Sequence, residues 1–121
     1  MKILVVDDSN IARKMTIKSI KEAISDKAEI IQASNGLEAL NEYKSSQPDL
    51  VFMDLTMPVM DGFEAVEKIK EIDKDAKIIT VSADIQKGAV DKTRELGVIG
   101  FIKKPINSNK VIEYIEKLGL N

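Results

Sequence analysis

The stretch FMDLTMPVMDG (Phe52–Gly62) decides the fold, because it carries an apolar run directly into a lone carboxylate, Asp54. Residue types that favour turns, Pro58 and Gly62 among them, follow soon after. A near-continuous apolar run with this ending is typical of a strand that is buried on both faces of a parallel sheet. Asp54 therefore either caps the following turn or stands at the edge of the sheet as a reactive group.

Four other short apolar runs repeat this pattern along the chain. Segments of helical length separate the runs, and most of them carry apolar residues at helical spacing. The repeated alternation of strand and helix predicts an α/β fold, a five-stranded doubly wound parallel sheet with five helices. The other predicted strands are Ile3–Val6, Ala28–Ala33, Lys77–Val81 and Val98–Ile102.

The first predicted helix begins near Ser9 or Asn10, and either residue can serve as its N-cap. Five apolar residues recur in it at roughly helical spacing: Ile11, Met15, Ile20, Ala23 and Ile24. Such spacing is typical of a helix with one apolar side.

Length and composition narrow the possible functions. With 121 residues the chain can form one domain around a single core, and its net charge of −2 offers no basic field for nucleic acid or membrane. The absence of cysteine and histidine excludes disulfides, thiolate or imidazole catalysis and the usual zinc sites. The N-terminal apolar run is too short for a signal peptide or a membrane span, so we expect a cytoplasmic protein.

Polar side chains stand at the ends of most of the predicted strands. Ligands of open α/β sheets bind outside the carboxyl ends of the strands, so we expect these side chains to converge. Clustered carboxylates favour a hard cation such as Mg²⁺, and a lysine and a hydroxyl can hold phosphoryl oxygens. Without histidine, a carboxylate is the obvious nucleophile, and Asp54 stands alone on the central run. The residues are Asp7, Asp8, Asp54, Ser82 and Lys104.

Four motifs, taken in their order and spacing, resemble the receiver domains of two-component response regulators. They are VVDDS (Val5–Ser9), DLTMPVMDG (Asp54–Gly62), TVSAD (Thr80–Asp84) and FIKKP (Phe101–Pro105). The resemblance covers essentially the whole chain, so we expect residues 1–121 to form a single receiver (response regulatory) domain. It implies the flavodoxin-like, or CheY-like, strand order 2-1-3-4-5 and a cis peptide bond before Pro105.

The resemblance also implies a role for each polar residue at the sheet edge. Asp54 would be the phosphoacceptor, and Lys104 and Ser82 would hold its phosphoryl group. Mg²⁺ would be the cofactor, bound directly by Asp8 and Asp54, through water by Asp7, and by the backbone carbonyl of Thr56.

Further positions would control switching and the lifetime of the phosphorylated state. The Ser82 hydroxyl would move toward the phosphoryl group, and Phe101 occupies the switch aromatic position of the family. Thr56 and Asp84 lie at the positions that tune hydrolysis of the acyl phosphate.

The fourth predicted helix, residues 85–96, has few apolar residues and an internal glycine, so we expect it to be held less firmly than its neighbours. Together with the fifth strand and the last helix it forms the expected output face. The protein would not be an enzyme in the usual sense, although it would catalyse its own phosphorylation and dephosphorylation.

The expected partners are a sensor histidine kinase, a protein that recognises the phosphorylated state, and in some pathways a phosphatase. We expect a monomer in which phosphorylation controls a chemotaxis or flagellar motor component. The alternatives are a phosphorelay intermediate that passes phosphate to a histidine phosphotransfer protein, and an interaction module that is never phosphorylated.

Two other protein classes fit the sequence less well. A haloacid-dehalogenase-type phosphohydrolase requires a second aspartate two residues after the nucleophile, where this chain has Thr56. A flavodoxin-like flavin carrier requires a phosphate-binding loop after the first strand, where Asp7 and Asp8 would repel the phosphate.

Overall fold

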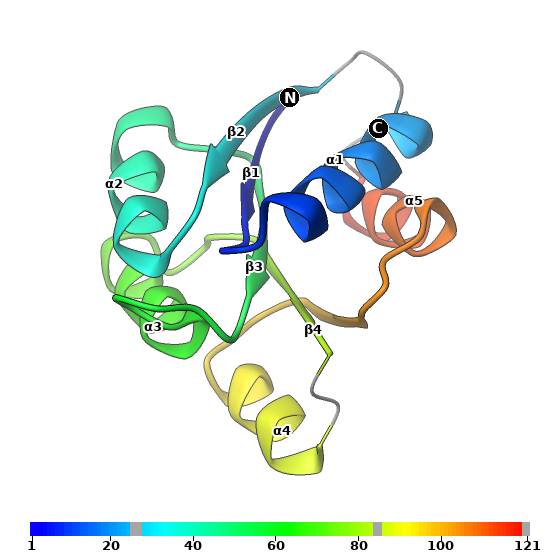
Figure 1. The fold of residues 1–121 in the computed structure, drawn as a ribbon. Coiled ribbons are helices and arrows are strands. Elements are labelled where there is room, and N and C mark those ends of the chain that lie inside the picture. The colour runs from blue at the N-terminus through cyan, green and yellow to red at the C-terminus, as the bar shows by residue number, and fades with distance from the viewer. Residues whose placement is uncertain (25–27, 84–85, 120–121) are drawn as a thin grey trace.

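The computed structural model describes residues 1–24, 28–83 and 86–119, which form one parallel sheet flanked by helices (Figure 1). The strand order is β2-β1-β3-β4-β5, which confirms the predicted doubly wound fold. No helix within the described ranges is both long and apolar enough to cross a membrane. The strands are β1 (Lys2–Val6), β2 (Glu29–Ala33), β3 (Leu50–Asp54), β4 (Ile78–Ser82) and β5 (Gly100–Lys103). The helices are α1 (Asn10–Ile24), α2 (Gly36–Ser46), α3 (Gly62–Ile72), α4 (Lys87–Glu95) and α5 (Ser108–Leu118).

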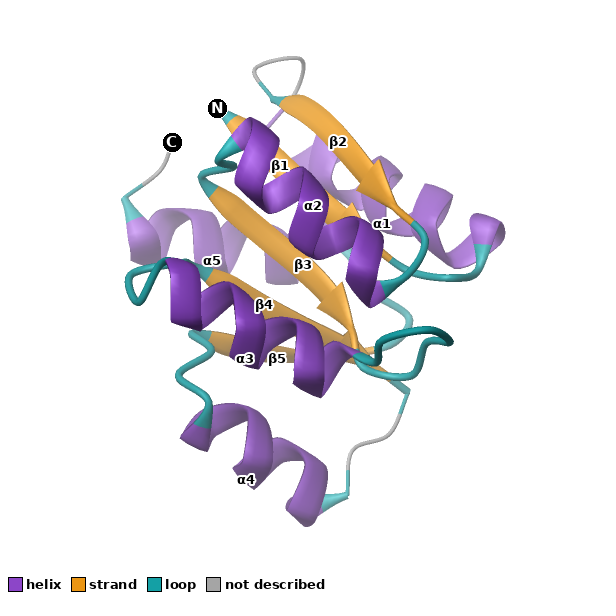
Figure 2. Cartoon of the chain, turned by 90° about the vertical axis from the view of Figure 1, so that its left-hand side faces the viewer, coloured by secondary structure: helices purple, strands orange, loops and turns teal. Residues whose placement is uncertain are grey.

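The sheet is covered on both faces, as the continuous apolar runs predict. Figure 2 shows α2 and α3 in front of the sheet, and α1 and α5 behind it. Successive residues of a strand point to opposite faces, so Met53 joins the core under α2 and α3 while Phe52 joins the core under α1 and α5. β3 is the central strand of the sheet, and all five of its residues are buried.

The strand order reverses between β1 and β3, and this reversal determines where a ligand can bind. From β1 the chain runs outward to β2, and it then returns to place β3 on the other side of β1. Val6 is paired with Met53, so Asp7 and Asp54, which follow these residues, end neighbouring strands. The two carboxylates therefore lie at the reversal point, the usual binding crevice of an open α/β sheet.

The start of α1 agrees with the N-cap prediction, but its predicted apolar side is wrong in part. Ser9 is the N-cap, because its hydroxyl oxygen accepts a hydrogen bond from the Ala12 N–H at 3.1 Å. Ile20 is buried, and the partly buried Ala23 and Ile24 pack against the same core. In contrast, Ile11 and Met15 remain 75% and 49% exposed. Nine residues correspond to about two and a half helical turns, so Ile11 lies on the opposite side of the helix from Ile20.

The last predicted strand begins later than expected, and α4 is largely exposed, as its few apolar residues predict. β5 starts at Gly100 instead of Val98, because Gly97 has a positive φ of 86° and ends the preceding turn. Among the residues that the structure describes, Thr93 is the only one of α4 that is fully buried. Figure 1 shows α4 at the β4–β5 end of the sheet, away from α1 and α2.

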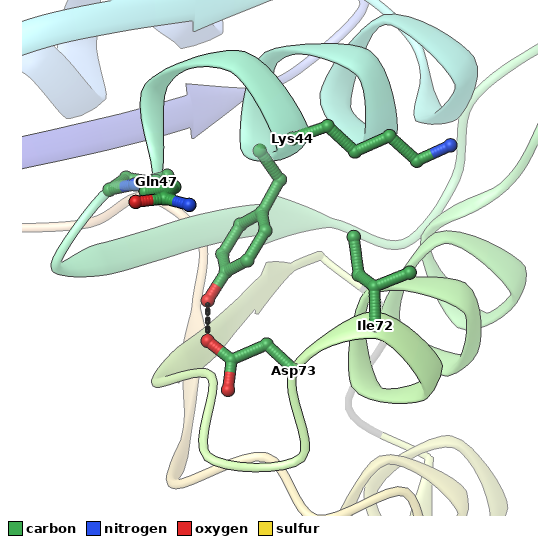
Figure 3. A pocket seen from close by; sticks show the side chains of 6 residues that line it. Lys44, Gln47, Ile72 and Asp73 are labelled. Atoms are coloured by element: carbon green, nitrogen blue, oxygen red, sulfur yellow. Dashed lines mark hydrogen bonds between the residues drawn. The ribbon is translucent and has the colours of Figure 1, made fainter.

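A hydrogen bond joins α2 to the C-cap residue of α3 (Figure 3). The Tyr43 hydroxyl donates to Asp73 Oδ2 at 2.7 Å across a shallow pocket that Lys44 and Ile72 also line. This hydrogen bond lowers the pKa of Asp73, and burial, followed by the contact with Asp73, raises the pKa of Tyr43. The stabilisation from the lowered carboxyl pKa is therefore present at neutral pH and is lost as the pH falls through that pKa.

Candidate functional site

Three carboxylates meet at the carboxyl ends of β1 and β3. Asp7, Asp8 and Asp54 each offer an oxygen atom, and these atoms all lie within 4.8 Å of one another. Asp7 and Asp54 are only 3% and 5% exposed, whereas Asp8 is open to solvent. The structure therefore brings together the three acids that the sequence places at strand ends.

Lys104 inserts its ammonium group between the two buried acids. Its Nζ lies 2.8 Å from Asp7 Oδ2 and 3.3 Å from Asp54 Oδ1. The main-chain N–H of Lys104 donates to the main-chain carbonyl of Ser82 at 2.9 Å, and this hydrogen bond joins the ends of β4 and β5 beside the acids. The Lys104–Pro105 peptide bond is cis, as the resemblance implied.

The cluster places a poorly hydrated carboxyl group, that of Asp54, beside a cation. Burial, followed by the charge of Asp7, raises the pKa of Asp54, while Lys104 and the Thr56 backbone hydrogen bond oppose this rise. Burial acts to lower the pKa of Lys104, but its contacts with Asp7 and Asp54 outweigh burial and raise it. Asp54 thus has little competing water around it and a cation within reach.

The donor set fits a divalent cation with hard oxygen ligands. Lys104 compensates only part of the negative charge of the three clustered carboxylates. Carboxylate oxygens at such separations suit Mg²⁺, which usually keeps several water ligands. Asp8, being exposed, leaves room for those waters on the open side of the cluster.

The loop between β3 and α3 is held by two glycines that allow close backbone contacts. The Gly62 N–H donates to the Leu55 carbonyl at 3.0 Å, and the Gly36 N–H of α2 donates to the Met60 carbonyl at 2.9 Å. An ideal Cβ would lie 2.1 Å from the Asp54 carbonyl oxygen at Gly62, and 2.2 Å from the Met60 carbonyl oxygen at Gly36. Neither site can accept a side chain without displacing the loop that follows Asp54.

The same loop contains a strained residue, Val59. Its φ is 69°, in the left-handed region that β-branched residues rarely adopt, and the Met60 N–H donates to the Pro58 carbonyl at 2.8 Å across it. This hydrogen bond between residues two apart defines a γ-turn. The Val59 side chain is 75% exposed and contributes little burial to offset the strain.

We therefore expect Val59→Asn to increase the free energy of unfolding by about 1 kcal/mol, because asparagine tolerates a positive φ. Chemical denaturation of both proteins measures the change. Val59→Ala is the matched control, since alanine removes the β-branch but still prefers negative φ, and it should give a smaller gain. A decrease in stability for the asparagine variant would contradict the proposed strain.

The remaining residues from the sequence lie around this centre. Ser82 is buried at the end of β4, Thr56 is exposed in the loop after Asp54, and Phe101 is partly buried on β5. Asp84 lies outside the described residues, so its predicted part in hydrolysis stays a prediction. Sequence reasoning missed Arg13 of α1, which donates a hydrogen bond to the Asp7 carbonyl at the start of the loop after β1. In the sequence, Arg13 looks like any other basic residue of a helix.

Comparison with known proteins agrees with this arrangement. Residues 3–116 match the family model of the response regulator receiver domain. The chain belongs to the response regulator receiver domain family. This receiver domain is 41% identical to the chemotaxis protein CheY of Listeria monocytogenes, with 97% of each chain covered. It is 43% identical to the CheY of Bacillus subtilis, covering 96% of this chain and 95% of that protein.

A solved structure confirms the fold of the receiver domain. The CheX-CheY-BeF3-Mg²⁺ complex of Borrelia burgdorferi contains a chain that superimposes with a TM-score of 0.88 at 33% identity. The match covers 100% of this receiver domain and 90% of that chain. The relatives and the fold together make this chain a response regulator with a CheY-like receiver domain.

Proposed function

We propose that the protein is a phosphorylation-controlled switch in which Asp54 accepts a phosphoryl group from a sensor histidine kinase. The observation that carries the proposal is the buried Asp54 carboxylate, which lies 3.3 Å from the Lys104 ammonium and is clustered with two further acids. These groups provide a nucleophile, a cation for the phosphoryl oxygens and ligands for a metal ion at one edge of the sheet. The similarity to CheY proteins supports chemotaxis as the pathway.

In the proposed transfer, an Asp54 carboxylate oxygen attacks the phosphorus of a phosphohistidine. The phosphorus–nitrogen bond breaks as the new phosphorus–oxygen bond forms, and the released imidazole nitrogen takes a proton from water. Lys104 neutralises part of the charge on the phosphoryl oxygens, and the Ser82 hydroxyl donates a hydrogen bond to one of them. Attack by water on the acyl phosphate later returns the carboxylate and releases inorganic phosphate.

Asp8, Asp54 and the Thr56 carbonyl would bind Mg²⁺ directly, and Asp7 would do so through water. When bound, the ion supplies positive charge to the phosphoryl oxygens. The Mg²⁺ in the Borrelia burgdorferi CheY complex supports this choice of metal. Thr56 and Asp84 are proposed to adjust how readily water attacks the acyl phosphate.

Incubation with acetyl phosphate and Mg²⁺, followed by intact-mass measurement, tests the proposal. We expect a mass increase of one phosphoryl group, and peptide mapping should place it on Asp54. The same incubation in EDTA should leave the mass unchanged. An unmodified protein at saturating donor and metal would support the alternative of an interaction module that is never phosphorylated.

The proposed output surface consists of α4, β5 and α5. A depression between α4 and α5 is lined by Val90, Thr93, Phe101 and Tyr114 among others, so Phe101 lies beside open space. Tyr114 packs closely against Gly100, because an ideal Cβ at that glycine would lie 2.3 Å from the tyrosine ring. Rotation of Phe101 would therefore change the shape of this surface while Tyr114 holds its position.

We expect Phe101→Ala to separate phosphorylation from the response of the output surface. Asp54 of the variant should still take up phosphate, because Phe101 is not among the cluster residues. In ¹⁵N NMR spectra of the parent, phosphorylation should shift amide signals near Asp54 and on α4. In the variant the shifts on α4 should be largely lost, and their full retention would contradict the switch role of Phe101.

One observation favours phosphorelay as a second candidate function. Ala12, Met15, Lys104 and Pro105 line a mainly apolar depression directly beside the phosphoacceptor cluster. A phosphotransfer protein that delivers or removes phosphate must contact this side of the molecule. Transfer of phosphate from the labelled protein to a histidine phosphotransfer domain would support this function.

A further inference from the structure

The guanidinium group of Arg13 makes three hydrogen bonds, one of them with the backbone of the acidic pair. Its Nη1 donates to the main-chain carbonyl of Asp7 at 2.7 Å, and its Nε donates to Gln32 Oε1 of β2 at 2.8 Å. Its Nη2 donates to the side-chain oxygen of Asn10, the first residue of α1. A single guanidinium group therefore connects β2, the end of β1 and the start of α1.

These contacts restrict the backbone from which both acidic side chains project. The Asp7 N–H donates to the Ala33 carbonyl at 3.1 Å, so the Asp7 peptide groups are held by β2 on one side and by Arg13 on the other. The Asp7 carboxylate also accepts a hydrogen bond from the Ser9 N–H at 2.9 Å. Asp8 is exposed, and its direction depends largely on the backbone that Arg13 fixes.

We propose that Arg13 is the positioning residue of the metal site, which holds the loop from Asp7 to Asn10 so that the acidic pair faces Asp54. This inference rests on the proposed function, since it concerns the Mg²⁺ site of the phosphoacceptor cluster. Arginine suits the role because its planar fork presents several donors in fixed directions, whereas a lysine ammonium would reach only part of the set.

Arg13 could act on the metal site through its charge or by positioning the ligands, and its removal would change the Mg²⁺ affinity in opposite directions in the two cases. A cation near a cluster of carboxylates repels Mg²⁺, so a purely electrostatic Arg13 would weaken metal binding and its removal would tighten it. A positioning Arg13 keeps the ligands in place, so its removal weakens binding despite the relief of repulsion. Outer contacts of metal sites typically change metal affinity by about 10-fold or more when they are removed.

The experiment is a titration of the ¹⁵N-labelled protein with MgCl₂ at constant ionic strength, followed by NMR for the parent, Arg13→Met and Arg13→Lys. We expect the Mg²⁺ dissociation constant to rise about 10-fold for Arg13→Met. The dissociation constant of Arg13→Lys should rise nearly as much, because lysine keeps the charge but lacks the planar, forked guanidinium group. Gln32→Leu removes one of the three hydrogen-bond acceptors of Arg13 and should raise the dissociation constant by less.

Lys14→Met is the matched control, since it removes one positive charge from the exposed neighbour on the same helix and should leave the affinity unchanged. Thermal unfolding in EDTA establishes that each variant is folded at the titration temperature. Unchanged or tighter Mg²⁺ binding by both Arg13 variants would overturn the inference, whatever their melting temperatures. An absence of saturable Mg²⁺ binding by the parent would overturn the proposed metal site as well, so the two failures are distinguishable.

Discussion

Asp54→Asn is expected to abolish covalent phosphorylation while the protein keeps its fold. The amide has the shape of the carboxylate but lacks the nucleophilic charge, so it cannot form the acyl phosphate. Lys104 retains its shorter contact, the one with Asp7 at 2.8 Å, and the repulsion between two buried acids disappears. Intact-mass measurement after incubation with acetyl phosphate, together with thermal unfolding, checks both parts of this prediction.

Asp61→Asn provides the matched control for the loss of one acid from the same loop. Asp61 is the exposed N-cap of α3 and accepts a hydrogen bond from the Glu64 N–H at 2.9 Å, a role that asparagine also performs well. This variant should take up phosphate as the parent does. Phosphorylation of Asp54→Asn at the parent level, mapped to another residue, would disprove the assignment of the phosphoacceptor.

Lys104→Met is expected to destabilise the protein by about 3 kcal/mol at neutral pH in EDTA, because it leaves two buried carboxylates without their cation. The side chains of Asp7 and Asp54 are only 4% and 6% exposed, so water cannot replace the ammonium group well. The pKa of Asp54, already raised in the parent, should rise further. The loss of stability in the variant should therefore become smaller as the pH falls and Asp54 takes up a proton, and denaturation at several pH values measures this change.

Two further variants test whether the effect of Lys104→Met comes from the buried ion pairs. Lys103→Met removes the exposed neighbouring lysine and should change stability by less than about 0.5 kcal/mol. Asp54→Asn combined with Lys104→Met should recover part of the loss, because only one uncompensated acid remains buried. Equal effects of the Lys103 and Lys104 variants would mean that the buried ion pairs contribute nothing to stability.

The order of the elements and the meeting of the acids could be predicted from the sequence, because both follow from local patterns. Apolar runs of strand length indicate a sheet covered on both faces, and parallel strands place their carboxyl ends together. The meeting of Asp7 and Asp54 could be predicted without further information, since each residue directly follows such a run. The depth of their burial and the insertion of Lys104 between them required the structure.

Other features depend on contacts that no local pattern contains. Arg13 looks like an ordinary surface residue of α1 until the fold brings Gln32 of β2 beside it. Gly36 looks like the start of a helix, and its close contact with Met60 arises only when α2 and the loop after β3 pack together. The error at Ile11 had a different cause, because the face that α1 buries includes the polar residues Thr16 and Ser19 beside Ile20, and an apolar pattern does not register them.

The two glycines that hold the loop after Asp54 also bear on how such a protein can diversify. Gly36 and Gly62 fix the course of the backbone, while Thr56 and Val59 between them point to solvent. Substitutions at the exposed positions can therefore accumulate without moving Asp54 or disturbing the core. Under the proposed function, natural variation would in this way retune the duration of a signal within a single lineage, and the machinery that creates the signal would be inherited intact.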